Sequence, residues 1–263
     1  MVKEVIERLK IIQNRISENL PQSIRPYCRG IKPESRGILF AGPRGVGKTT
    51  YILQSIKDRP YFYLSADNPL VGTVTLYDLV EAIFLQGYEG VVIDEIHFGH
   101  NWSAHLKALY DSFPGKILWA SDSSSVFLRS GISDLSRRFK IIALPLLSLR
   151  EFIALNEGLD FDPLDPFSVS AAGAAKIVSK VNVLRIFQNY IRYGFRPIYL
   201  EGPADYADKV MNTVYKTMQM DIPFLIPRLT ENHLRLMHAI VGYLGMSVIP
   251  QLNISNLTAE WAL

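Results

Sequence analysis

The amino-acid sequence predicts an α/β fold built around a parallel sheet of five strands. Five short apolar runs alternate with stretches of helical periodicity, and the runs lie at residues 37–41, 61–65, 91–94, 117–120 and 139–144. Strands that alternate with helices are typical of a parallel sheet that helices cover on both faces. The runs are continuously apolar rather than alternating, as expected for strands that are buried on both faces.

The composition favours a globular protein in a reducing compartment. The chain has 263 residues and is 48% hydrophobic, which is enough for a sizeable core and for one or two small appended domains. Cys28 is the single cysteine, so no disulfide can form within the chain. The sequence contains no signal-peptide core and no apolar run that would span a bilayer. We therefore expect a cytoplasmic protein without a membrane partner.

The N-terminal segment predicts an amphipathic helix followed by a basic linker. Apolar side chains recur at helical spacing from Val5 to Leu20 within residues 2–20, and Pro21 ends the pattern. Residues 1–36 hold eight Lys and Arg against four Asp and Glu, whereas the whole chain carries a net charge of only +3. Two interpretations stay open: the helix packs on the core, or it binds a partner or a neighbouring copy.

A glycine-rich motif follows the first apolar run. Residues 37–50 read GILFAGPRGVGKTT, and Gly42, Gly47, Lys48 and Thr49 satisfy the pattern G-x-x-x-x-G-K-[ST]. Glycines let the backbone wrap a phosphate with its N–H groups inward, and the following helix directs its positive end at the anion. The lysine would contact the β- and γ-phosphates, and the threonine hydroxyl would help to hold Mg²⁺.

This motif predicts a P-loop nucleoside triphosphatase that binds ATP or ADP with Mg²⁺. The residues that we expect around the nucleotide are Gly42, Pro43, Arg44, Gly45, Val46, Gly47, Lys48, Thr49 and Thr50.

Two acidic residues end the third apolar run. Residues 91–95 read VVIDE, which describes a buried strand with carboxylates at its C-terminal end, the edge where open α/β sheets bind ligands. Asp94 would hold Mg²⁺ through its waters, and Glu95 would orient and polarise the attacking water. The alternative is a pair of solvated acids. The second acid favours a hydrolase over a P-loop kinase of small molecules.

Small polar residues end the fourth apolar run and are candidates for sensing the γ-phosphate. Ser121, Asp122 and Ser123 all qualify, with Ser121 as the catalytic candidate. The alternative is that Ser123 or Ser124 simply caps the following helix.

Three histidines follow the acidic pair, namely His97, His100 and His105. No cysteine lies nearby and their spacing fits no standard zinc-ligand pattern, so a metal site is disfavoured. We expect His97 near the γ-phosphate and the other two on the surface or in packing contacts.

Three stretches together resemble the AAA+ class of P-loop ATPases. They are GPRGVGKTT, VVIDEIHFGHNWSAHLKALYD and RFKIIALPLLSLREF, of which the last is the most diagnostic. Within that class the chain is similar to a prokaryotic family that joins an AAA-type core to a winged-helix segment and a C-terminal domain of unknown role. The resemblance is good over residues 36–200 and looser in the remainder.

The resemblance implies roles for two arginines. Arg138 would be an arginine finger that acts on the nucleotide of a neighbouring copy, which implies a homo-oligomer. The segment FQNYIRYGFRP at 187–197 resembles the lid of the family, so Arg196 would touch the phosphates, with Arg192 as the alternative. At Phe195 and Arg196 the chain departs from the family, which carries a glycine-aromatic pair there.

These patterns divide the chain into four parts. Residues 1–36 form the N-terminal helix and linker, 37–158 the P-loop ATPase core, 159–225 a helical lid, and 226–263 a partial winged-helix-like segment. In the last part basic residues do not outnumber acidic ones, which disfavours binding to a phosphate backbone. A protein partner is therefore at least as well supported as DNA. The last helical pattern stops without a C-capping residue, so we expect a longer native protein.

The predicted function is Mg²⁺-dependent hydrolysis of ATP to ADP and phosphate, coupled to a conformational or assembly change. The alternative is a slow nucleotide-dependent switch that binds DNA or a protein partner. A helicase ranks third: the DEIH sequence at 94–97 resembles a helicase acidic box, but such enzymes need two recombinase-like lobes and this chain has length for one.

Overall fold

The computed structural model describes most of the chain, namely residues 1–123, 135–165, 167–226 and 228–246. Two compact units make up the chain, Met1–Tyr206 and Ala207–Leu263, and each is described by itself. The four-part division drawn from the sequence stays a prediction. The helix that Ser123 or Ser124 was expected to cap falls at 124–134, outside the described residues.

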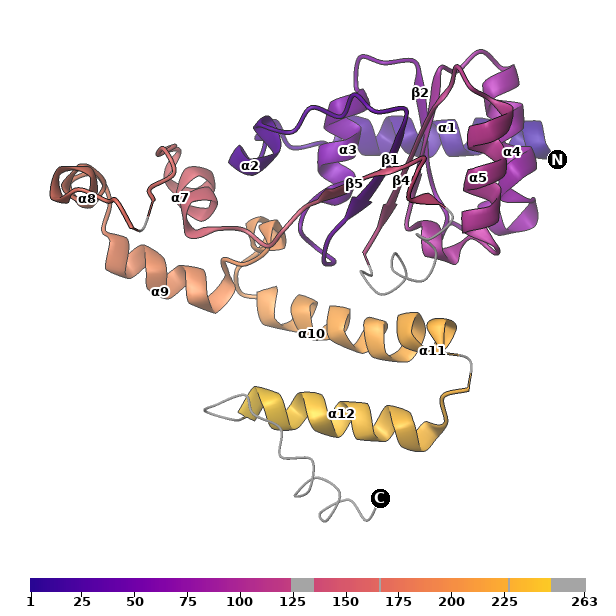
Figure 1. The fold of residues 1–263 in the computed structure, drawn as a ribbon. Coiled ribbons are helices and arrows are strands. Elements are labelled where there is room, and N and C mark those ends of the chain that lie inside the picture. The colour runs from indigo at the N-terminus through magenta and orange to yellow at the C-terminus, as the bar shows by residue number, and fades with distance from the viewer. Residues whose placement is uncertain (124–134, 166, 227, 247–263) are drawn as a thin grey trace. The chain divides into compact units, whose positions relative to one another are not determined.

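Five parallel strands form one sheet in the first unit, which confirms the predicted α/β class (Figure 1). They are β1 (Gly37–Ala41), β2 (Tyr61–Ser65), β3 (Gly90–Asp94), β4 (Ile117–Asp122) and β5 (Lys140–Ala143), in the order β2-β3-β4-β1-β5. The fourth strand runs two residues further than its apolar run at 117–120, because pairing with β1 continues to Asp122. Of the small polar residues that were expected to end this strand, Ser121 and Asp122 belong to it and Ser123 follows it.

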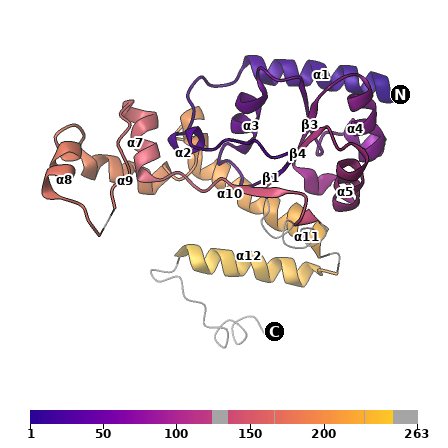
Figure 2. The same ribbon diagram turned by 45° about the horizontal axis from the view of Figure 1, so that its top comes forward.

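Helices lie on both faces of the sheet (Figures 1 and 2), and an apolar core fills the space between each face and its helices. The first face carries α1 (Val2–Glu18), α4 (Leu76–Leu85) and α5 (Trp102–Ser112), and the second carries α2 (Pro26–Arg29) and α3 (Lys48–Ile56). Successive strand residues enter opposite cores: Val91 and Ile93 lie in the first and Val92 in the second. Burial on both faces explains why the strands are continuously apolar.

Helix α1 packs on the sheet, as the first of the two interpretations of the N-terminal helix expects, and the binding of a partner or a neighbouring copy stays a prediction. Val5, Ile6 and Leu9 are buried in the first core, and the helix contacts β2 and α4. The amide side chain of Gln13 bonds to the backbone of β2. It donates to the carbonyl oxygen of Tyr61 at 3.2 Å and accepts from the N–H of Tyr63 at 3.0 Å. These bonds cover the free edge of the outermost strand.

The region after β5 is helical. It contains α7 (Leu149–Glu157), α8 (Ala171–Val178), α9 (Val183–Tyr193) and the short 3-10 helix η3 (Pro197–Glu201). The helical pattern expected over 171–193 is split in two, because the Asn182 side chain accepts a hydrogen bond from the N–H of Arg185 at 3.1 Å and starts a new helix there.

The second unit consists of helices in the residues described. They are α10 (Tyr206–Lys216, whose first residue closes the first unit), a π-helical segment η4 (Thr217–Asp221), α11 (Ile222–Leu225) and α12 (Glu231–Met246). Helices were expected at 204–220 and 231–245, and both are present. The last expected helix, at 255–263, lies outside the described residues, so the winged-helix-like character expected for 226–263 stays a prediction.

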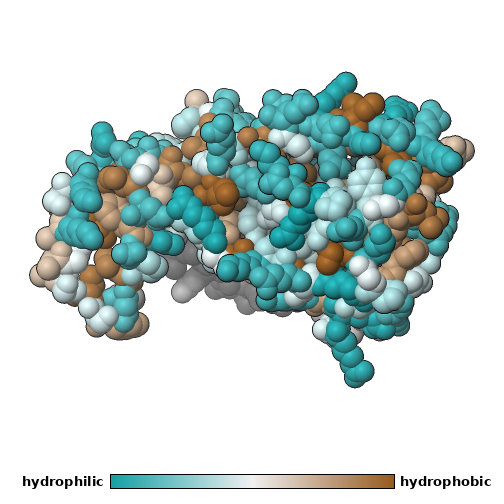
Figure 3. Space-filling view, turned by 90° about the horizontal axis from the view of Figure 1, so that it is seen from above, coloured by the Kyte–Doolittle hydropathy of each residue, from teal (hydrophilic) through white to brown (hydrophobic). Residues whose placement is uncertain are grey.

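The described helices are each too short or too polar to cross a membrane. On the face shown in Figure 3, hydrophobic residues are scattered among hydrophilic ones.

Candidate functional site

The candidate site lies at the carboxyl edge of the sheet, where β1, β3 and β4 end. The glycine-rich loop follows β1, Asp94 is the last residue of β3, and Asp122 is the last residue of β4. Because the strands are parallel, these three chain segments emerge side by side. Ligands of open α/β sheets bind at this edge.

The loop after β1 has a backbone that requires glycine at specific positions. Gly45 and Gly47 have positive φ angles of 76° and 89°, in the left-handed region that other residues rarely adopt. A β-carbon at Gly42 would overlap the carbonyl oxygen of Leu144, so this glycine lets the loop pack closely against the end of β5. Helix α3 begins directly after Gly47, at Lys48.

Lys48 is buried, and its ammonium group is held by the loop and by the end of β4. Nζ donates to the carbonyl oxygens of Gly42 at 2.7 Å and Pro43 at 3.2 Å, and to Ser123 Oγ at 2.9 Å. Burial lowers the pKa of Lys48 below its ordinary value of 10.5, and the nearby carboxylates of Glu95 and Asp94 oppose that shift. An anion placed beside Nζ would favour its charged form.

Asp94 is buried and accepts hydrogen bonds from four groups. Oδ2 accepts from the Thr49 hydroxyl at 2.6 Å and from the Tyr63 hydroxyl at 2.9 Å. Oδ1 accepts from the Ser121 hydroxyl and from the N–H of Glu95 at 3.0 Å. Burial and the charge of Asp94 raise the pKa of Tyr63 far above 10.0, which keeps this phenol a donor. The sequence pattern did not identify Tyr63, because nothing local distinguishes it from the other apolar residues of β2.

Glu95 follows β3 in a backbone conformation that is unusual for a residue with a side chain. Its φ is 47° and its ψ is 47°, and such left-handed conformations cluster at functional sites. Glu95 Oε1 accepts a hydrogen bond from Ser123 Oγ at 2.6 Å and lies 3.7 Å from a guanidinium nitrogen of Arg44. The Ser123 hydroxyl therefore touches both Glu95 and Lys48.

His97 is buried beside two carboxylates. Its Nδ1 lies 3.1 Å from Asp122 Oδ1 and 3.6 Å from Glu95 Oε2, and these three residues offer atoms within 4.8 Å of one another. His100 is exposed and His105 is half-buried. The three histidines thus do not share one environment, and His97 alone of them lies next to Glu95.

Arg196 reaches the glycine-rich loop from the region after α9. Its Nε donates to the carbonyl oxygen of Arg44 at 3.1 Å, and a β-carbon at Gly45 would lie 3.3 Å from its Cδ. Ile198 of η3 lies over Gly45 as well. Arg192 is exposed on α9. The expected lid segment therefore packs on the loop through Arg196.

Arg25 also contacts the loop, and the sequence analysis missed it. The buried guanidinium donates to the carbonyl oxygen of Val46 at 2.7 Å and to that of Pro145 at 3.1 Å. It forms a two-pronged ion pair with Glu151, at 3.0 and 3.1 Å. Arg25 stands in a turn-rich basic stretch without periodicity, so no local signal marks it.

Arg138 lies away from this group, at the amino edge of the sheet. It precedes β5, and the Arg138 carbonyl lies against Gly37, the first residue of β1. Four residues of β5 separate it from the carboxyl edge, about 13 Å at the rise of a strand. Its guanidinium makes a two-pronged ion pair with Asp111 of α5, both bonds 2.8 Å long.

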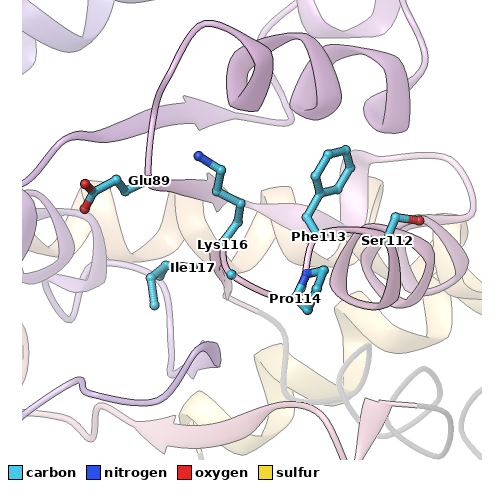
Figure 4. Close-up of a pocket in the computed structure, with 7 residues that line it drawn as sticks. Glu89, Ser112, Phe113, Pro114, Lys116 and Ile117 are labelled. Atoms are coloured by element: carbon cyan, nitrogen blue, oxygen red, sulfur yellow. The ribbon is translucent and has the colours of Figure 1, made fainter.

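A surface pocket opens at the same amino edge (Figure 4). It is lined by Glu89, which precedes β3, and by residues 112–117, which lead into β4. Lys116 Nζ donates to the carbonyl oxygen of Tyr88 at 2.7 Å. The pocket is separate from the glycine-rich loop.

Residues 34–153 match a family described as an AAA domain. Among solved structures, the Thermotoga maritima RuvB Holliday junction branch migration motor is 18% identical, with a TM-score of 0.44; the match covers 99% of this chain and 82% of that one. A substituted form of Thermotoga maritima RuvB is 19% identical over the same shares, with the same TM-score. No curated protein matches the chain.

The family match spans the glycine-rich loop, the acidic pair and all five strands, and ends in α7. It confirms the resemblance to the AAA+ class, whereas the narrower resemblance to a prokaryotic family with a winged-helix segment stays a prediction. Residues 34–153 of this chain therefore form an AAA domain, a nucleotide-binding domain of the AAA+ class of P-loop ATPases.

Proposed function

We propose that this chain binds ATP with Mg²⁺ and hydrolyses it to ADP and phosphate, and that hydrolysis drives a conformational or assembly change. One observation carries the proposal: Lys48, Asp94 and Glu95 meet in one hydrogen-bonded cluster at the carboxyl edge, joined by Thr49 and Ser123. Each of the three belongs to a different step of phosphate chemistry, and solvated acids at a strand end would not share these partners.

The loop and the start of α3 supply the phosphate-binding groups. Gly45 and Gly47 leave room for the backbone to approach an anion, and the free N–H groups at the start of α3 provide donors and a positive dipole end. Lys48 would exchange its loop carbonyl partners for phosphate oxygens. Burial lowers the pKa of Lys48, and the negative charge of a bound phosphate would oppose that shift and stabilise the ammonium form.

Thr49 and Asp94 fit a magnesium ion. They present a hydroxyl and a carboxylate oxygen 2.6 Å apart, and hard oxygen donors are the ligands that Mg²⁺ prefers. Mg²⁺ held there would neutralise charge on the phosphates. Tyr63 and Ser121 donate to the same carboxylate and fix its orientation.

Glu95 is the group that would orient water. In the hydrolysis, the water oxygen attacks the γ-phosphorus, the bond to the ADP oxygen breaks, and Glu95 accepts a hydrogen bond from the attacking water. In this structure its carboxylate is bonded to Ser123, whose hydroxyl also contacts Lys48. We therefore favour Ser123 for sensing the γ-phosphate, with Ser121 supporting Asp94.

Arg138 would complete the site of a neighbouring copy. It lies at the opposite edge of its own sheet, farther from its own loop than an arginine side chain reaches, so a catalytic role requires a second chain. Its exposed ion pair with Asp111 would have to open for this contact, which costs little at a surface.

Phosphate release tests the proposal. The parent and Lys48→Ala are incubated with MgATP over a range of protein concentrations, with and without duplex DNA, and MgATP binding is measured in parallel. We expect turnover only in the parent, rising per chain with protein concentration. A parent that binds ATP without turnover supports the switch instead, particularly if DNA changes its affinity. A parent that neither binds nor hydrolyses ATP contradicts both functions.

A further inference from the structure

The Arg25 side chain joins three segments that are distant in the sequence. It starts in the stretch before the AAA domain, donates to Val46 in the glycine-rich loop and to Pro145 after β5, and pairs with Glu151 in α7. Both partners of the ion pair are buried, Arg25 with 7% and Glu151 with 2% of their surface exposed. The guanidinium is therefore held in one place by four hydrogen bonds.

The bond to Val46 acts on the part of the loop that faces a phosphate. In a trans peptide the C=O of one residue and the N–H of the next point in opposite directions, and the described residues contain no cis peptide. Fixing the Val46 carbonyl toward Arg25 therefore directs the Gly47 N–H to the other side of the loop. A β-carbon at Gly47 would lie 3.9 Å from Arg25 Cδ, so the arginine stem supports the same peptide.

Glu151 gives Arg25 its orientation. Its carboxylate accepts both prongs of the guanidinium and also takes part in a capping box with Ser148 at the start of α7. Burial by itself would raise the pKa of Glu151, but the hydrogen bonds from Arg25 and Ser148 outweigh it and hold that pKa below its ordinary value of 4.5. The carboxylate is thus a charged, fixed acceptor.

We propose that Arg25 is a positioning residue of the nucleotide site: it holds the Val46 carbonyl so that the Gly47 N–H presents to phosphate, and Glu151 orients it. The inference rests on the proposed function of this same site. A purely structural ion pair has a different signature, because two well-packed apolar residues can replace a buried pair with little loss of stability. Apolar residues cannot replace the bond to the Val46 carbonyl.

That difference sets the experiment. Binding of MgADP, which needs no hydrolysis step, is measured by calorimetry for the parent, Arg25→Met and the double variant Arg25→Met with Glu151→Met, each well below its unfolding temperature. The single variant leaves Glu151 buried without its partner and should unfold at lower temperature. The double variant should regain most of that stability and yet bind MgADP at least about ten-fold more weakly, the effect of losing a charged hydrogen bond.

Arg29→Met is the matched control. Arg29 ends the short helix α2, which Arg25 precedes as its N-cap. It pairs with Asp160 at 2.6 Å, but that pair is exposed and does not touch the loop. Its MgADP affinity should equal that of the parent.

A double variant with parental affinity would overturn the inference. If the methionine variants do not fold, MgADP binding by Arg25→Lys tests the inference instead. An ammonium group cannot make the paired bonds to Glu151 and both carbonyl bonds together, so this variant should bind MgADP several-fold more weakly than the parent. Parental affinity there would also overturn it. A parent that does not bind MgADP contradicts the proposed function itself, a result visible before any variant is compared.

Discussion

The Thr49 hydroxyl donates a hydrogen bond of 2.6 Å to Asp94 Oδ2, joining the start of α3 to the end of β3. The two residues are 45 positions apart in the sequence, and only the parallel order of β1, β4 and β3 brings them together. A hydroxyl and a carboxylate that meet beside the glycine-rich loop are hard oxygen donors of the kind that Mg²⁺ prefers, which leads to the first prediction.

Asp94→Asn should remove the magnesium dependence of ATP binding. In the parent, affinity for ATP should fall when Mg²⁺ is removed with EDTA, because the cation links the phosphates to the carboxylate. In the variant, affinity should be low and the same under both conditions. Calorimetry with and without Mg²⁺ measures this. Asp67→Asn, an exposed acid after the neighbouring strand β2, should behave like the parent. A variant that keeps the magnesium dependence excludes Asp94 as a ligand.

Arg138→Ala should be nearly inactive as an ATPase but should recover activity in mixtures. In a mixture with Lys48→Ala, the Arg138→Ala chain supplies an intact pocket and the other chain supplies an intact arginine. In related systems such an arginine raises kcat by a factor of about 10³–10⁵. Recovery should grow with protein concentration. Because the pair with Asp111 is exposed, the substitution should change stability little. An alanine variant that hydrolyses ATP at the parental rate removes the finger assignment. Inactivity that mixing does not rescue would contradict an action of Arg138 on a neighbouring copy.

Arg196→Ala should weaken ATP binding, and Arg192→Ala should not. Arg196 contacts the loop backbone at Arg44, and its charge would lie near the phosphates, whereas Arg192 is exposed on α9. We expect an affinity loss of about ten-fold for the first variant, the effect of one charged hydrogen bond. Equal affinities for the two variants would mean that the lid arginine does not touch the nucleotide.

Stability should fall at acid pH through Glu151. Its folded-state pKa lies below the ordinary value of 4.5, so its contribution is fully present above pH 4.5 and is lost as the pH falls through the lower folded pKa. Thermal unfolding between pH 3 and 6 should show a steeper loss for the parent than for Glu151→Gln, which cannot titrate. Parallel curves for the two proteins would show that this carboxyl does not have a depressed pKa.

The sequence predicted those parts of the site whose signals are local. The five strands, the glycine-rich loop and the acidic pair each lie within a few consecutive residues, and period and motif identify them directly. The sequence did not identify Arg25 and Tyr63, because their roles arise from distant contacts. Arg25 contacts Glu151, 126 positions away, and Tyr63 contacts Asp94, 31 positions away. Nothing in their own neighbourhood records those contacts.

The N-terminal helix shows a different limit. Its apolar stripe indicated that one face would be covered, but periodicity does not distinguish the protein's own core from a partner or a neighbouring copy. Burial of Val5, Ile6 and Leu9 against the sheet answers that question, and it explains why the helix needs no partner for this face. The stripe expected at Ile16 is only partly covered, with 36% of that residue exposed.

Comparison of ATP binding and hydrolysis in Glu95→Gln tests the central claim most directly. The substitution keeps the shape of the side chain and its acceptor for Ser123, so MgATP should bind as in the parent. Turnover should fall by a factor of about 10² or more, because the amide cannot polarise the attacking water as a carboxylate does. Glu89→Gln, at the opposite end of the same strand, is the matched control and should keep both properties. Normal binding with lost turnover is the predicted result; hydrolysis by Glu95→Gln at the parental rate would contradict the account.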